Sequence, residues 1–169
     1  MKQLSERLKI KEYFYPYAEK INPILYSLIQ ESEDDTQKYP NVHVKMTKWN
    51  LKSKEVELLT QWIQSLIMRD FSSGDCCECR SVWGVLYNRG DSIGIHDHHS
   101  SYSFAYYVNV PRGSSSLTFS TSGYRVKPET GKLVVFESRL KHHIPPNRCD
   151  NRCVISGNFN TPASLRGDL

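Results

Sequence analysis

From Val82 onward, short apolar or alternating segments follow one another at close spacing, and this pattern constrains the fold more than any other feature. Turn-forming residues separate them at 88–91 (NRGD), 111–113 (PRG), 122–123 (SG) and 145–147 (PPN). Short strands divided by turn signals are typical of a compact antiparallel barrel or jelly roll. We therefore expect strands within VWGVLY, SYSFAYYVNV, SLTFST, YRVKP, KLVVF and RCVISGNF.

The first part of the chain mixes two short strand patterns with two helical ones. Residues 8–14 partly alternate, with Leu8, Ile10 and Phe14 on one face, and residues 42–49 also predict a strand. Asn22 followed by Pro23 predicts the N-cap and first position of a helix. Ser53 predicts the cap of a second helix with the apolar stripe Val56, Leu59, Ile63, Leu66 and Ile67.

The length of 169 residues is that of one domain, at roughly 150 residues per domain. The hydrophobic content of 38% is ordinary for a globular protein and excludes a collagen or a disordered chain. We therefore expect one α+β domain. Residues 1–81 would support a barrel core formed by residues 82–163, with the helices packed outside.

The charge balance and the apolar runs exclude two classes of partner. Lysine and arginine number 22 against 18 acidic residues, a net charge of +4, and we see no clustered basic face that would predict nucleic-acid binding. No apolar run approaches the ~20 residues of a membrane span. Residues 1–11 lack the apolar core of a signal peptide. We expect a cytoplasmic protein that binds neither nucleic acid nor membrane.

The five cysteines are expected to be reduced thiols, because their number is odd and no export signal precedes them. Cys76 and Cys79, together with Cys149 and Cys153, are an alternative set of four zinc ligands. Cys153 lies in an apolar run, where a buried thiol is the commoner role. We therefore expect no zinc on these residues.

Five of the six histidines fall into two tight groups that bracket the barrel pattern: His96, His98 and His99, then His142 and His143. In an extended segment His96 and His98 share a face. The third ligand of a metal site would then come from the second group. Imidazole suits iron, copper, nickel or zinc and does not suit magnesium or calcium.

A second candidate site lies on the last apolar segment. If this segment is a strand, Arg152, Val154, Ser156 and Asn158 share one face. A guanidinium and a hydroxyl on one face can bind a carboxylate together. Beside a metal site, this pair predicts an acidic co-substrate with two anionic ends.

The stretch from Trp83 to Asn160 resembles the double-stranded β-helix of the iron(II)- and 2-oxoglutarate-dependent oxygenases. It is most similar to the small oxygenases of that superfamily carried by cyanobacterial phages, and more distantly to the prolyl hydroxylases. The matching pieces, in order, are WGVLYNRGD, IHDHHSSYSFAYYVNVP, GKLVVFESRLKHHIPPN and RCVISGN. The resemblance implies this fold, iron(II) as cofactor and 2-oxoglutarate as co-substrate. For a phage protein it also implies a location in the host cytoplasm.

By position, His96, His98 and His142 match the metal ligands of that superfamily. Arg152 matches the arginine that binds the distal carboxylate of 2-oxoglutarate, and Ser156 matches the hydroxyl beside it. The resemblance implies that 2-oxoglutarate chelates the iron at one end while Arg152 holds the other. The reaction that it implies is hydroxylation of a C–H bond.

Aromatic residues complete the expected site. Tyr107 falls where a prolyl-hydroxylase-like enzyme places a tyrosine on the same carboxylate, although packing on a strand would also explain it. Four further aromatic residues are candidate walls of the pocket: Trp83, Tyr87, Tyr102 and Phe104.

The sequence departs from the superfamily at the metal triad. The usual set is two histidines and one carboxylate, whereas the matched frame here reads His-x-His. A shifted frame of Asp97, His99 and His143 would restore a carboxylate. In the matched frame these three residues would lie behind the ligands or on the substrate side. A three-histidine iron carries one more positive charge than the usual site.

Two other functions stay open beside the dioxygenase. The segment IHDH also resembles the metal segment of cysteine dioxygenase, a cupin with three histidines and no 2-oxoglutarate, but this leaves Arg152 and Ser156 unexplained. The third hypothesis is a binding module, a barrel that binds metal and 2-oxoglutarate without turnover. We expect the iron(II)- and 2-oxoglutarate-dependent dioxygenase, whose prime substrate can be a protein side chain, a peptide or a small metabolite.

Overall fold

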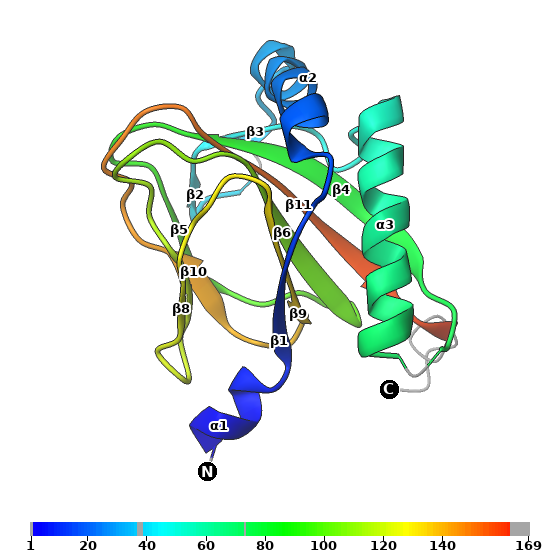
Figure 1. The fold of residues 1–169 in the computed structure, drawn as a ribbon. Coiled ribbons are helices and arrows are strands. Elements are labelled where there is room, and N and C mark those ends of the chain that lie inside the picture. The colour runs from blue at the N-terminus through cyan, green and yellow to red at the C-terminus, as the bar shows by residue number, and fades with distance from the viewer. Residues whose placement is uncertain (1, 37–38, 73, 163–169) are drawn as a thin grey trace.

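The computed structural model describes residues 2–36, 39–72 and 74–162, which form two antiparallel sheets that face each other (Figure 1). The six-stranded sheet has the order β1 (Ile10–Phe14), β9 (Lys132–Glu137), β6 (Tyr102–Asn109), β11 (Arg152–Asn160), β4 (Glu78–Tyr87) and β3 (Lys45–Met46). The five-stranded sheet has the order β2 (Val42–His43), β5 (Ser92–His96), β10 (His142–Ile144), β7 (Leu117–Phe119) and β8 (Arg125–Val126).

In the second half of the chain, successive strands alternate between the sheets, except that β7 and β8 pair with each other in the same sheet. The strands β4, β6, β9 and β11 belong to the six-stranded sheet, and β5, β7, β8 and β10 belong to the other. This is the topology of a double-stranded β-helix, so the predicted fold class is confirmed. Every apolar segment predicted after Val82 contains a strand. The short strands β5 and β10, which carry histidines, were not among them.

Helices cover the outer face of the six-stranded sheet, as predicted. Figure 1 shows α2 (Ala18–Glu31) and α3 (Lys54–Asp70) on this face, whereas the six-residue α1 (Lys2–Arg7) precedes β1. Gly84 on β4 lets α2 come close, because a Cβ there would lie 2.3 Å from Cγ1 of Ile29. The helices therefore leave the inner face of the sheet free to line the barrel.

The strand β11 shows how the sequence divides its side chains between two environments. Cys153 and Ile155 point outward into the apolar cluster beneath the helices. Arg152, Val154 and Ser156 point inward and line a cavity between the sheets. This is the period-two alternation of a strand. It places Arg152 and Ser156, the pair predicted to bind a carboxylate, inside the barrel.

The helix α3 forms as the sequence predicts. The Ser53 side chain accepts a hydrogen bond from the backbone N–H of Val56 at 3.2 Å and so caps the first turn. The buried residues of the helix are the predicted stripe: Val56, Leu59, Ile63, Leu66 and Ile67.

The predicted start of the first long helix is wrong. α2 begins at Ala18, so Pro23 lies inside it and Asn22 is not its cap. The Asn22 side chain instead donates to the backbone oxygen of Val108 and accepts from the Tyr106 hydroxyl. These buried hydrogen bonds to β6 hold the helix on the sheet. An Asn22 side chain that capped the helix could not form them.

Two predicted strands also differ in detail. β1 begins at Ile10, which is buried, whereas Leu8 is 73% exposed and Phe14 is 58% exposed. The predicted strand at 42–49 divides into β2 and β3, which pair with different sheets. Because the chain crosses between the sheets here, a single strand cannot form.

Within the described ranges, no helix is both long and apolar enough to cross a membrane.

Candidate metal and carboxylate site

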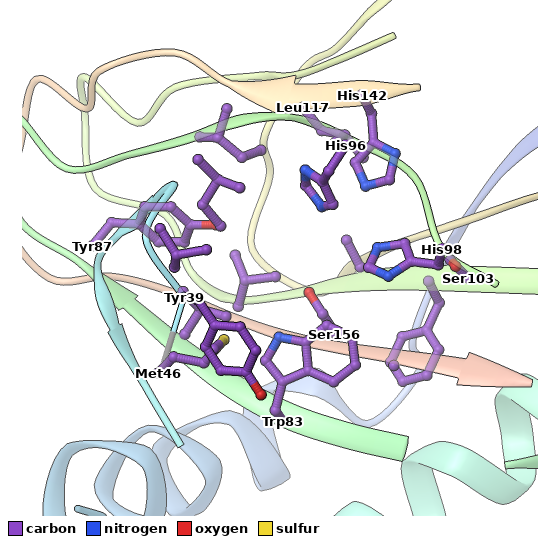
Figure 2. A pocket seen from close by; sticks show the side chains of 18 of the residues that line it. Tyr39, Met46, Trp83, Tyr87, His96, His98, Ser103, Leu117, His142 and Ser156 are labelled. Atoms are coloured by element: carbon purple, nitrogen blue, oxygen red, sulfur yellow. The ribbon is translucent and has the colours of Figure 1, made fainter. Parts of the chain in front are cut away.

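Three predicted histidines meet at the edge of the barrel cavity. His96 ends β5 and lies directly opposite His142, the first residue of β10. His98 follows two residues later in the loop. One ligand atom from each of the three lies within 4.8 Å of the others, and Figure 2 shows the rings pointing toward one another. This separation suits a single metal ion.

Backbone carbonyls hold two of the three rings. Nδ1 of His96 lies 2.8 Å from the oxygen of Gly94, and Nδ1 of His142 lies 2.7 Å from the oxygen of Leu140. A carbonyl only accepts hydrogen bonds, so each Nδ1 carries the proton. Nε2 of both rings is then left with a free lone pair, which is the form that binds metal.

Burial keeps the cluster ready for a metal. It lowers the pKa of His98 to about 4, with a further contribution from the like charge of His96. It also lowers the pKa of His142 to about 3, again with His96 as the next cause. Near neutral pH these two rings are therefore neutral, with one protonated nitrogen each, and do not have to lose a further proton before they bind a cation.

The alternative ligand set is not brought together. Asp97 and His99 are exposed. His143 belongs to the opposite face of β10 from His142, where its Nδ1 lies 3.1 Å from Oγ of Ser120. Among the described residues, only the three-histidine group has three or more metal-binding side chains this close together, so the cysteines do not form the alternative zinc site.

A cavity of about 310 Å³ between the sheets joins the histidines to the residues that are predicted to bind a carboxylate. Its lining includes Arg152, Ser156 and Tyr107 from the six-stranded sheet. Most of the remaining lining is apolar or aromatic. Asp97 at its exposed edge is the one acidic residue among the described side chains that line it.

Among the described residues that line this cavity, Arg152 is the one buried cation, and the one acidic residue lies at the exposed edge. The residue is 1% exposed, and its Cζ lies 4.1 Å from the centroid of the Tyr87 ring. Within the part of the chain that the structure describes, its Nε and Nη1 have no hydrogen-bond partner. A buried charge without a partner is costly. The site therefore fits an anionic ligand.

Tyr107 contributes a second free donor beside this arginine. Its ring centroid lies 5.5 Å from Cζ of Arg152. It is fully buried, and its hydroxyl also has no hydrogen-bond partner among the described residues. Two converging donors of this kind match a carboxylate, which accepts several hydrogen bonds.

The predicted pocket walls are correct with one exception. Trp83, Tyr87 and Phe104 line the cavity. Tyr102 does not, because its ring packs outside the barrel against Phe71, with a centroid separation of 5.3 Å.

Sequence reasoning missed several lining residues, among them the aromatic residues Tyr39 and Trp49. Both lie in irregular segments that flank β2 and β3. Tyr39 lies outside the predicted elements, and Trp49 ends the predicted strand 42–49 but follows β3 in an irregular segment, so no period indicated that these rings face the cavity.

Comparison with known proteins identifies the architecture. No family model and no curated protein matches this sequence. Among solved structures, the collagen prolyl hydroxylase of Paramecium bursaria Chlorella virus-1 in complex with 2-oxoglutarate has a TM-score of 0.72 at 12% identity. The match covers 89% of this chain and 95% of the viral one.

Two bacterial structures are similar to a comparable degree. An oxidoreductase of the 2OG-Fe(II) oxygenase family from Burkholderia pseudomallei has a TM-score of 0.71 at 11% identity, covering 94% of this chain and 87% of that one. A prolyl-4-hydroxylase from Pseudomonas putida has a TM-score of 0.68 at 17% identity, covering 90% and 92%. The chain thus has the double-stranded β-helix fold seen in these oxygenases.

Proposed function

We propose that this protein is an iron(II)- and 2-oxoglutarate-dependent dioxygenase that hydroxylates a C–H bond. The observation that carries the proposal is the buried guanidinium of Arg152, whose Nε and Nη1 have no hydrogen-bond partner among the described residues and which lies in the same cavity as three converging histidines. A ligand with a carboxylate at one end and metal-binding oxygens at the other satisfies both. 2-Oxoglutarate has this chemistry, and the similar viral structure is a complex with it.

Each residue has a defined task in this proposal. His96, His98 and His142 hold iron(II), which with 2-oxoglutarate and dioxygen supplies the redox chemistry when bound. Arg152 and Tyr107 bind the carboxylate remote from the metal, with Ser156 assisting on the same face of β11. The apolar walls exclude water, which strengthens these charged contacts.

Three neutral imidazoles leave the full +2 charge on the metal, whereas a carboxylate ligand would reduce it to +1. The nearest acidic residue in sequence, Asp97, is exposed. The dianionic co-substrate is therefore the main compensation for the metal and for Arg152. The three-histidine ligand set also makes binding without turnover the second candidate function, because a less electron-rich iron activates oxygen less readily.

For the prime substrate we propose a peptide or protein side chain. Two of the similar structures are named as prolyl hydroxylases, one of them acting on collagen. A small metabolite is the alternative. The kinship with phage oxygenases and the cytoplasmic location remain predictions, which none of the structures named above tests.

The experiment that tests the function measures 2-oxoglutarate binding without oxygen, and then succinate formed per iron in air. In Arg152→Ala we expect binding weaker by about one to four orders of magnitude, since removing one partner of a buried charge pair costs roughly 2–5 kcal/mol. The exposed Arg139, which pairs with Glu137, provides the control variant Arg139→Ala. Equal 2-oxoglutarate affinity in Arg152→Ala and the parent would contradict the proposal and favour the three-histidine thiol dioxygenase.

The variant His98→Asp separates the enzyme from the binding module. It restores the usual ligand set, so we expect it to form succinate faster than the parent. Succinate from the variant and none from the parent would show that the natural site binds without turnover.

A further inference from the structure

The three candidate ligands are not supported in the same way. His96 and His142 each have Nδ1 held by a backbone carbonyl. The ring of His98 makes no hydrogen bond to any residue that the structure describes. Its backbone N–H donates to the oxygen of Ser138 at 2.9 Å, which fixes the chain but not the ring. Its ring neighbours are the other two candidate ligands, His96 and His142, with centroids at 5.0 and 5.3 Å, and one aromatic residue that is not a candidate ligand.

An aromatic stack lies beside the His98 ring. The centroid of Trp83 is 6.0 Å from that of His98, with the planes tilted by 48°. Trp83 stacks on Trp49 at 4.5 Å and 15°, and Trp49 stacks on Tyr39 at 5.6 Å and 9°. Three nearly parallel rings thus form one wall of the cavity, and Figure 2 shows two of them, Tyr39 and Trp83.

This wall is anchored on the sheet at its inner end. Trp83 is buried on β4, where it pairs in register with Ser156 of β11. Trp49 is 38% exposed and covers the face of Trp83. Stacked aromatic pairs of this kind stabilise one another beyond the effect of the area that they bury. The indole beside His98 is therefore held firmly.

We propose that Trp83, backed by Trp49 and Tyr39, is the positioning residue that orients the His98 ring for metal binding. His98 lies beyond the end of β5, so the strand ladder no longer constrains it. The torsion that rotates an imidazole is broad and has no strong intrinsic minimum. A rigid indole beside the ring limits that freedom on one side. This inference rests on the metal site of the proposed function.

The test is cobalt(II) binding, read as affinity and as the visible absorption that reports coordination geometry. For Trp83→Leu we expect an affinity about 10- to 100-fold lower, the usual loss when the support of a metal ligand is removed, and an altered spectrum. Trp83→Phe keeps a flat ring and should recover much of both. Trp49→Ala, at a more exposed position, should shift both in the same direction by less and serves if Trp83→Leu does not fold.

The third tryptophan of the chain gives a matched control. Trp62 lies on α3 outside the barrel, where it packs against Tyr13 and Tyr15. Trp62→Phe removes the same indole but should leave cobalt affinity and spectrum at the parent values. A change there as large as in Trp83→Leu would mean that the effect reflects general loosening and would overturn the proposal.

A double-mutant cycle shows whether Trp83 acts through His98. In a His98→Ala background, Trp83→Leu should cause no further loss of cobalt affinity, because the ligand that it orients is gone. The same loss in both backgrounds would overturn the proposal, as would parent-like affinity and spectrum in Trp83→Leu. A parent protein that binds no cobalt would instead overturn the metal site, and the proposed function with it.

Discussion

Tyr106 and Tyr107 are adjacent in β6 and fully buried, yet only the Tyr106 hydroxyl has a hydrogen-bond partner among the described residues. The Tyr106 hydroxyl donates to Oδ1 of Asn22 at 2.7 Å, outside the barrel under α2. The Tyr107 hydroxyl faces the cavity without a partner among the described residues. The strand alternation thus gives one tyrosine a structural bond and leaves the other free for a ligand.

This pair predicts opposite effects of the same substitution. Tyr107→Phe should weaken 2-oxoglutarate binding roughly 10- to 100-fold, since a hydrogen bond to a charged group is worth about 1.5–3 kcal/mol. It should not lower the free energy of unfolding of the ligand-free protein. Tyr106→Phe should lower that free energy by about 1 kcal/mol and leave 2-oxoglutarate affinity unchanged. Calorimetric titration and denaturant unfolding measure the two quantities.

At the level of single residues, the sequence predicts the direction of a side chain where a strand sets the spacing. His96, His142, Arg152 and Ser156 all reach one cavity from strands. Tyr39 and Trp49 lie in irregular segments, where no period relates a position to a direction. Their part in the cavity depends on the fold as a whole.

The contact between α2 and β4 depends on the missing side chain of Gly84. Gly84→Ala would place a methyl group 2.3 Å from Cγ1 of Ile29, at a fully buried position of α2. We expect the free energy of unfolding to fall by about 1–3 kcal/mol, the usual cost of overpacking. Gly94→Ala on β5 is the control, because its nearest neighbour would be 3.7 Å away, an ordinary contact. Equal unfolding midpoints for the two variants would contradict this account of the interface.

A hydrogen-bonded carboxylate joins the end of α3 to β1. Asp70 accepts hydrogen bonds from the Arg69 guanidinium and from the Tyr13 hydroxyl, the latter at 2.7 Å. These bonds hold the pKa of Asp70 well below its ordinary value. Because the folded-state pKa is lowered, the charged carboxylate stabilises the folded state above about pH 4, its unfolded pKa.

The stabilisation from Asp70 should therefore disappear as the pH falls. We expect Asp70→Asn to lower the free energy of unfolding at pH 7 by about 1 kcal/mol, because the group is partly exposed. The difference between variant and parent should shrink steadily below pH 4, where unfolding favours protonation of the parent. Urea unfolding at several pH values measures it. A difference that is constant from pH 7 to pH 3 would contradict the assigned cause.

Among the elements, the long ones were the easier to predict. α3 has a cap and a complete apolar stripe, so its sequence specifies it locally. β5 and β10 have five and three residues, and their pairing with each other is a contact between distant segments. The start of α2 was missed because Asn22 has a partner on β6, which no local pattern reveals.

At the scale of the whole molecule, the candidate site lies where the two sheets face each other. The five-stranded sheet supplies His96 and His142, and the six-stranded sheet supplies Arg152 and Tyr107. The sequence predicted this architecture because alternating segments and turns repeat through its second half. Neither sheet carries both halves of the site, so a ligand that uses both must bridge them.

This placement predicts that metal and 2-oxoglutarate together stabilise the whole barrel. A ligand that binds only the folded state at a hundred times its Kd adds about 2.7 kcal/mol to the free energy of unfolding. We expect denaturant unfolding without oxygen, with zinc(II) as the metal, to show this gain on adding 2-oxoglutarate to the metal-loaded parent. The control variant Arg139→Ala should show the same gain.

Arg152→Ala should respond to the metal as the parent does, but its gain from 2-oxoglutarate at that concentration should be about half that of the parent or less, because its carboxylate site has lost the cation while the histidines are intact. In the ligand-free variant, the loss of packing lowers the free energy of unfolding. The removal of the charge should not lower it further, since the variant no longer buries a cation without an anionic partner. If 2-oxoglutarate stabilises Arg152→Ala as much as the parent, the carboxylate binds elsewhere. A site that bridges the two sheets through this arginine would then be excluded, whatever the histidines bind.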